Sequence, residues 1–271
     1  FRYAGLQGAG AMGWNFGGEH ISTNTMVYAN GTFVNFWSFQ GDATAAPRVL
    51  SDGLTRGGPL GMTLAQVRGN LNVSSDNRKP LRISAGVNAG RTELGGASGG
   101  FAFGMIWRPS SSLHLSLSPS YRASRDPVQY VGSRTDGTAV ATYGKRYLFA
   151  QIDQRTLDLT TRLNVTVTPT LSLQLYVQPF IGTGGYQRFK ESLAPRAADY
   201  LTYGQTPGSV QRDSMDAQGH LVGHTVDPDG AGPRPSVWIG NPDFSSRSLR
   251  GNAVLRWEYR PGSTLYVVWT Q

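Results

Sequence analysis

The chain has 271 residues, of which 39% are hydrophobic and only 15% are charged, and its formal net charge is +8. The absence of cysteine excludes disulfides, thiolate metal sites and cysteine nucleophiles. No run of about 18 apolar residues occurs, which argues against a transmembrane helix, and so low a charged fraction is typical of a sheet with one apolar and one polar face rather than of a soluble domain.

The first 60 residues carry the weakest periodic pattern. The Gly-rich segment 5–18 predicts either a strand with close packing or a Gly kink. The sequence Ala-Asn-Gly-Thr at 29–32 fits a type I′ hairpin turn. The polar stretch 41–60 is expected to be a long loop, and a turn is expected at 75–80.

Further along the chain, apolar and polar residues alternate with period two, which predicts strands that are half exposed. Leu171, Leu173 and Leu175, for example, alternate with Ser172 and Gln174. The pattern covers the segments 81–90, 113–122, 157–167, 171–181 and 248–259.

The connections between these strands are of two kinds. Tight Pro-containing turns are predicted at 108–111, 168–170 and 260–263, whereas 91–100, 124–144 and 188–245 are expected to be loops. Short turns on one rim and long loops on the other are typical of outer-membrane barrels. Strict alternation of the two kinds requires a single strand at 145–168, whose outer end (147–150) would project beyond a bilayer.

Aromatic residues stand near the predicted strand ends. Trp107 precedes one tight turn, Trp257 and Tyr259 precede another, and Tyr121 lies at the opposite end of its strand. Amphipathic rings at strand ends are typical of interfacial girdles. The alternative is the aromatic core of a soluble β-sandwich, which has the same alternation.

Together these patterns predict an all-β protein, an antiparallel transmembrane β-barrel segment of about ten strands. An open sheet in lipid would leave two edges with unsatisfied backbone groups. The strands therefore either close on themselves or belong to a larger barrel, and the second is favoured because both ends read as cut. Residues 1–271 are expected to form this incomplete segment, with 188–245 as a long extracellular loop.

The polar face of the predicted strands is rich in charged residues. A row of arginines with few acids would favour anionic solutes in a lumen, whereas a cross-strand ladder would merely close a plugged interior. Arg56, in a predicted turn, is a candidate for constricting the pore. The predicted lumen-lining residues are Arg68, Arg82, Arg122, Asp158, Arg162, Arg250, Arg256 and Glu258.

Metal-binding signals are weak, and no cofactor is predicted. Asp227 and Asp229 before a Gly resemble the start of a calcium loop but lack the remaining ligands. His220 and His224 are four residues apart in a Gly- and Asp-rich loop, not on a helix, so the zinc spacing has little meaning there.

Signals for catalysis are also weak, and the protein is not predicted to be an enzyme. The segment 96–100 matches the letters G-x-S-x-G, but it is expected to be a flexible loop rather than a strand-to-helix turn. His114 and Ser116 share the polar face of one strand, which leaves a barrel hydrolase as a minor alternative.

Several segments resemble a family of bacterial outer-membrane barrels of unknown function that follow a carbohydrate-binding-module-like N-terminal domain. They are LTRGGP (54–59), SDNRKP (75–80), TLSLQLYVQPF (170–180), NPDF (241–244) and SLRGNAVLRWEYRPGS (248–263). The resemblance implies a Gram-negative-type envelope and a larger parent protein. The chain departs from the family pattern because it lacks the N-terminal domain and a final strand with a terminal aromatic signal.

The functional expectation is a pore or transport channel in the bacterial outer membrane, for anionic or carbohydrate solutes. The alternative is a non-transporting barrel that displays surface loops and a glycan-binding partner domain. Expected partners are the lipid bilayer and lipopolysaccharide, with glycans or another envelope protein as further candidates. Nucleic acid is not expected, because the arginines are scattered rather than clustered.

Overall fold

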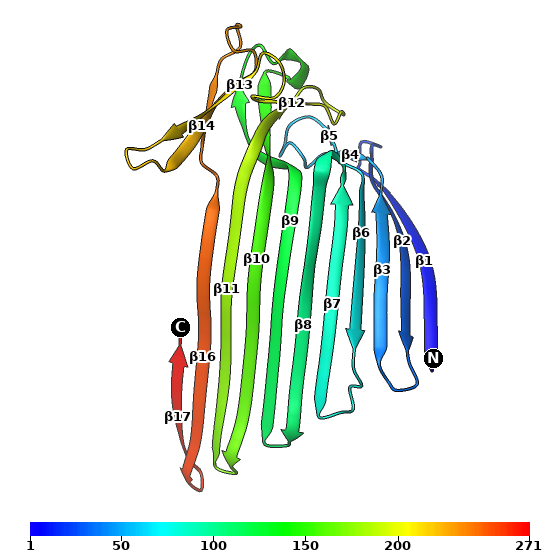
Figure 1. Ribbon diagram of the computed structural model, residues 1–271, viewed down its shortest axis with the longest axis vertical. Coiled ribbons are helices and arrows are strands. Elements are labelled where there is room, and N and C mark those ends of the chain that lie inside the picture. The colour runs from blue at the N-terminus through cyan, green and yellow to red at the C-terminus, as the bar shows by residue number, and fades with distance from the viewer.

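The computed structural model describes residues 1–271 and consists mainly of one curved antiparallel sheet (Figure 1). The sheet has twelve strands, and eleven of them follow one another in the order β1-β2-β3-β6-β7-β8-β9-β10-β11-β16-β17, while β12 pairs with β11. The long strands are β1 (Tyr3–Trp14), β2 (His20–Thr32), β3 (Ser38–Ala46), β6 (Gln66–Ser74), β7 (Leu81–Thr92), β8 (Gly96–Ser110), β9 (Leu113–Thr135), β10 (Lys145–Thr168), β11 (Leu171–Ser192), β16 (Phe244–Arg260) and β17 (Ser263–Thr270).

The short elements lie in the connections at one end of the long strands, the upper end in Figure 1. We call residues 47–65, 136–144 and 193–243 the mouth loops. The short elements are β4 (Leu50–Ser51), β5 (Gly61–Met62), β12 (Tyr200–Thr202), β13 (Val210–Met215), β14 (Leu221–Asp227), β15 (Val237–Gly240) and the 3-10 turns η1 (Glu93–Gly95) and η2 (Val140–Thr142). Strands β13, β14 and β15 form a separate three-stranded sheet.

The connections alternate between the lower and the upper end of the sheet as predicted, but the upper connection between β7 and β8 is only η1 and is shorter than the lower turn at 75–80. The single long strand expected at 145–168 is confirmed as β10, which pairs with β9 on one side and β11 on the other. The predicted all-β antiparallel class is therefore confirmed. The structure contains no helix that is long and apolar enough to cross a membrane.

The predicted loop 124–144 was too long, because β9 continues to Thr135, so Tyr121 lies near the middle of β9 rather than at its end. Two other local predictions were also wrong. Residues 29–32 lie inside β2, and the chain turns at 33–37 instead, where Phe36 has φ +66°. Residues 96–100 lie in β8, and the connection before them is only η1. Both errors arose because glycine was taken as a sign of a turn or a loop. The hydrogen bonds between strands are made by the backbone, so a glycine can join a strand wherever the neighbouring strands already fix the register.

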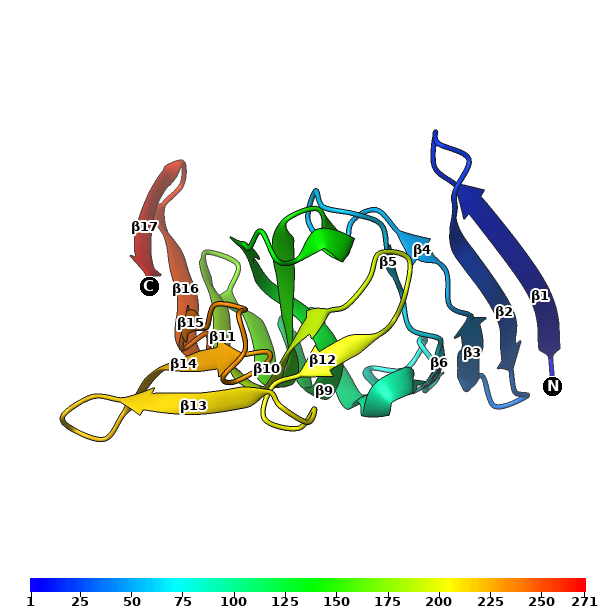
Figure 2. The same cartoon turned by 90° about the horizontal axis from the view of Figure 1, so that it is seen from above.

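The register sorts the side chains of the sheet onto two faces. Leu163 of β10 lies between Leu115 and Leu175 on the adjacent strands, whereas its neighbour Arg162 lies between Ser116 and Tyr176. Because successive residues of a strand point to opposite faces, one face is mainly apolar and the other mainly polar. Loop 47–65 contributes to a cavity whose floor is on the polar face, and β4 and β5 lie within the concave side in Figure 2. The polar face is therefore the concave one.

The upper ends of β9, β10 and β11 are covered on both faces. One cluster joins Leu148, Ala150 and Phe189 to residues of β12, β14 and β15. A second cluster joins Tyr147 and Phe149 to Val128 and to loop residues on the other side. The buried core therefore lies at the mouth, while the rest of the large sheet, which we call the wall, is a single layer.

The sheet does not close on itself. Strand β1 pairs only with β2, and β17 pairs only with β16. Figure 2 shows the resulting trough, with β1 and β17 at its two rims. Each rim leaves one row of backbone groups without a strand partner.

Candidate functional site

The predicted lumen residues all occupy the concave face of the wall. Arg82 and Arg162 stand in one row across four strands, with Ile106 and Ser116 between them. The other members lie at positions of the same parity, as the strand pairings show. They are Arg68, Arg122, Asp158, Arg250, Arg256 and Glu258.

Glycines on neighbouring strands give these arginines room. A Cβ on Gly100 would lie 3.1 Å from Cγ of Arg122, and a Cβ on Gly90 would lie 3.2 Å from Cγ of Arg68. Both contacts are tighter than ordinary van der Waals packing. Gly90 and Gly100 therefore leave room on the concave face, where long side chains spread along the sheet.

The acids on the concave face neutralise only part of its positive charge. Asp158 accepts a hydrogen bond from Gln178 at 2.8 Å, and Gln178 accepts one from Tyr176 at 2.7 Å. Glu258 pairs with Arg256 at 3.4 Å. The guanidinium of Arg162 lies over the Tyr176 ring, 5.4 Å from its centroid. The remaining arginines of the predicted set form no ion pair, so the face keeps an excess of cations.

A strap, residues 193–199, crosses the mouth of the trough. Arg196 donates through Nη1 and Nη2 to the two carboxylate oxygens of Glu19, each at 2.7 Å, and its backbone N–H donates to the carbonyl of Leu60. The hydrogen bond from Arg196 lowers the pKa of Glu19. Glu19 follows β1 and the strap follows β11, so this contact links distant parts of the sheet.

Arg56, the predicted constriction residue, lies in the mouth loop 47–65. It is exposed, has φ +53°, and its guanidinium lies 5.7 Å from the Tyr130 ring centroid. The contact across the mouth is instead made by Arg196. No local signal in the sequence identifies Arg196, because its partner Glu19 is 177 positions away.

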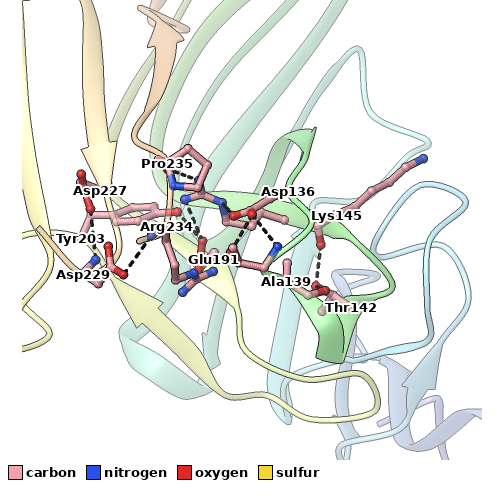
Figure 3. Close-up of polar contacts among 12 residues, drawn as sticks. Asp136, Ala139, Thr142, Lys145, Glu191, Tyr203, Asp227, Asp229, Arg234 and Pro235 are labelled. Carbon is pink, nitrogen blue, oxygen red and sulfur yellow. Dashed lines mark hydrogen bonds and ion pairs between the residues drawn. The ribbon is translucent and has the colours of Figure 1, made fainter. Parts of the chain in front are cut away.

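A buried polar cluster holds the mouth loops together (Figure 3). Arg146 is only 1% exposed and lies 2.8 Å from Asp136 and 3.5 Å from Glu191. Glu191 also pairs with Arg234 at 2.7 Å and accepts a hydrogen bond from the Tyr203 hydroxyl at 2.6 Å. The cluster thus joins the mouth loop 136–144, β10, β11 and the segment after β14.

Burial and charge act on this cluster in opposite directions. Burial raises the pKa of Asp136, but hydrogen bonds from Thr138 and the charges of Arg146 and Arg234 outweigh it, so the pKa lies below its usual value. Burial and the nearby Glu191 raise the pKa of Tyr203. The acid is therefore held ionised and the phenol protonated, as the hydrogen bonds require.

A cavity of about 290 Å³ opens beneath loop 47–65 at the upper end of the concave face. Its polar lining includes Arg68, Ser98, Ser124 and Asp126, together with Arg91 and Arg125 from the adjoining strand positions, and Leu54 contributes an apolar part. A small polar or anionic solute has donors and acceptors here.

The weak metal candidates fulfil structural roles. Asp227 caps an Asp-Gly turn through hydrogen bonds from the N–H groups of Asp229 and Gly230, at 3.1 and 2.8 Å. His220 pairs with Asp216 at 3.1 Å, and His224 pairs with Asp213 at 2.7 Å. No group of three or more potential metal-ligating side chains occurs.

The candidate catalytic residues are not assembled into a site. His114 and Ser116 are both on the concave face, but two residues along a strand are separated by roughly 6.5 Å, and no hydrogen bond joins them. Ser98, the serine of the G-x-S-x-G match, lies within strand β8, which is followed by a turn and another strand.

Trp238 lies in strand β15 of the long loop. It is 57% exposed on the outer face of the β13-β14-β15 sheet, and Cβ atoms on Gly223 and Gly240 would collide with its ring. It pairs with Thr225, which helps to line a cavity of about 380 Å³ together with Arg212, Asp227 and Ser236.

Comparison of the chain with protein-family models and with curated proteins gave no match. The functional assignment therefore rests on the geometry of the chain itself.

Proposed function

We propose that the chain forms part of the wall of an outer-membrane β-barrel, with its convex face toward lipid and its concave face along a water-filled passage. The observation that carries the proposal is the separation of apolar and polar faces across the long strands. One convex row reads Leu81, Trp107, Leu115, Leu163, Leu175, Ala253 and Trp269. In water such a surface would be an exposed apolar patch far larger than monomeric proteins usually tolerate.

The free rims of β1 and β17 support a larger barrel. An unpaired backbone group in hydrocarbon costs several kcal/mol. We therefore propose that further strands pair with both rims and complete the wall. The alternative, an open sheet in lipid, would expose the unpaired backbone groups of β1 and β17 to hydrocarbon.

The ends of the wall fit the two interfaces of a membrane. Trp107 and Trp257 stand exposed beside the short turns, where interfacial aromatic residues are expected. The longer connections and the buried core lie at the opposite end. This arrangement fits a Gram-negative-type envelope with the mouth loops outside, and it agrees with the resemblance to the outer-membrane family, which stays a prediction.

The excess of arginines on the concave face favours passage of anionic or carbohydrate solutes. Rings of cationic side chains select anions in pores. Arg82, Arg122 and Arg250 have no ion-pair partner along the wall and are available to a passing solute.

The test begins with the full protein in its membrane. We expect it to fractionate with the outer membrane and, after detergent extraction, to migrate anomalously on gels until it is heated. Reconstituted in planar bilayers, it should conduct with anion selectivity, and the double variant Arg82→Gln/Arg162→Gln should lower that selectivity. Arg247→Gln, on the convex face, is the control. A protein that stays in buffer without detergent would overturn the barrel, and a membrane-embedded protein without conductance would overturn the pore.

A second candidate function, display of a sugar-binding surface, is favoured by Trp238. An exposed indole lying flat on a sheet, beside a cavity with Arg212, Thr225 and Asp227, has the two features that bind a pyranose: an apolar platform and hydroxyl partners. Trp238→Ala should abolish retention on a glycan matrix and leave conductance unchanged. Phe244→Ala, an exposed aromatic of β16, is the matched control.

A further inference from the structure

Three arginines on the convex face interrupt its apolar character at the upper end of the wall. Arg91 and Arg125 stand on either side of Ala97 in one row, and Arg155 occupies the next row below. All three side chains are exposed. Their parity places them on the side of Leu157 and Tyr121, opposite the concave face.

Small residues leave a groove between these arginines. The row of Arg155 continues through Ala123, Gly99, Ala89 and Gly69. A Cβ on Gly99 would meet nothing closer than 3.8 Å. The space above these residues is a cavity of about 360 Å³, lined in part by Ala97, Gly99, Ala123, Arg125 and Arg155. We call it the arginine groove.

Directly below the groove the surface is apolar. The next convex row contains Leu71, Val87, Phe101, Tyr121, Leu157 and Ile181, and it continues to Arg247 on β16. The rings of Phe101 and Tyr121 lie 5.9 Å apart. Cations and apolar side chains therefore meet along one line on the same face of the sheet.

The charge of the groove is only partly compensated. Arg125 pairs with Asp153, with donor–acceptor distances of 2.8 and 3.4 Å, and Asp153 also accepts a hydrogen bond from Gln187 at 2.8 Å. Arg91 and Arg155 form no ion pair. A guanidinium offers a planar set of N–H donors that matches a phosphate. Within the groove, Arg155 has no ion-pair partner and Arg125 is already oriented by Asp153, while Arg91 stands beside Ala97 at the edge of the groove, outside the cavity lining.

We propose that the arginine groove binds the phosphate of an anionic lipid, whose acyl chains lie on the apolar row below. The proposal rests on the membrane-embedded wall proposed above and adds a specific lipid site to it. The cations stand at the boundary where an apolar wall meets the mouth, which is where headgroups would lie. A groove floored by Gly and Ala admits a headgroup close to the backbone, which a larger side chain would prevent.

The experiment compares the full protein in nanodiscs of phosphatidylcholine alone and of phosphatidylcholine with an added anionic phospholipid or lipid A. Lipid retention is measured by native mass spectrometry. We expect selective retention of the anionic lipid, and the double variant Arg91→Gln/Arg155→Gln should weaken it on the order of thirtyfold, since each cation near a membrane surface contributes about 1 kcal/mol. The control Arg82→Gln/Arg162→Gln removes two arginines from the concave face and should leave retention unchanged.

The possible failures are distinguishable. If the protein does not enter nanodiscs of either composition, the proposed function fails and the lipid site with it. If it enters both but the two double variants behave alike, the wall stands and the arginine groove is not a lipid site. Millimolar inorganic phosphate is the last test. If it displaces the lipid, and if it binds equally well when no anionic lipid is present, the groove is a site for free anions and the lipid assignment is overturned.

Discussion

The wall and the upper ends of β9, β10 and β11 use the same strands in opposite ways. In the wall, Leu163 and Asn164 point to different faces, and neither face is covered by another layer. Seventeen residues earlier on the same strand, Arg146 and the four residues after it are all buried. Around Leu163, apolar and polar residues alternate because the two faces of the strand meet different surroundings. From Arg146 to Ala150 every residue is buried, because this part of the strand lies between two layers of the core.

The buried polar cluster gives the largest expected effect. Arg146→Met removes the charge that faces Asp136 and Glu191, and breaking a buried pair costs about 3–5 kcal/mol. We expect faster hydrogen exchange and proteolysis at residues 200–240, with the wall unchanged. Arg122→Met, which removes an exposed arginine from the wall, should leave the loops protected. Equal protection in both variants would show that the apolar clusters alone hold the mouth.

The two faces of the wall are compared most directly at neighbouring positions. Leu163→Arg should destabilise the membrane-inserted protein by about 2–4 kcal/mol, the cost of Arg on a lipid face near the bilayer midplane. Asn164→Arg, one residue further on the concave face, should cost little. Reversible unfolding from phospholipid vesicles measures both. Similar costs would contradict the assignment of the convex face to lipid.

Acid should loosen the mouth before the wall. Because the pKa of folded Asp136 lies below its usual value, its contribution is fully present above the ordinary Asp pKa of about 3.9 and is lost as the pH falls through the lower, folded value. Proteolysis with an acid-active protease from pH 5 to pH 2 should show mouth loops that open progressively. Asp136→Asn should remove this part of the pH dependence. A pH dependence that persists in the variant would assign it to other carboxylates.

The strap gives the smallest expected effect, because its ion pair is exposed. Glu19→Gln should broaden the distribution of distances between spin labels at positions 17 and 195 without altering the stability of the wall. The swapped double variant Glu19→Arg/Arg196→Glu should narrow the distribution again. An unchanged distribution in Glu19→Gln would show that the backbone contact of Arg196 with Leu60 positions the strap.

The sequence by itself determined the alternating segments between residues 81 and 259 and their two faces. Period-two alternation is a local property, because adjacent residues of a strand point to opposite sides, so Arg162, Arg250 and the other members of the predicted set could be assigned to one face before the structure was known. The alternation of turns and loops likewise required β10 to be one strand.

Only the tertiary structure decided what lies at the mouth. The pairing of Arg196 with Glu19, the cluster around Arg146 and the exposed position of Trp238 depend on residues far apart in the chain, and no local period encodes such contacts. The glycine-containing segments 29–32 and 96–100 were misassigned for a related reason. Glycine tolerates both strand and turn, so the choice was made by the strands on either side.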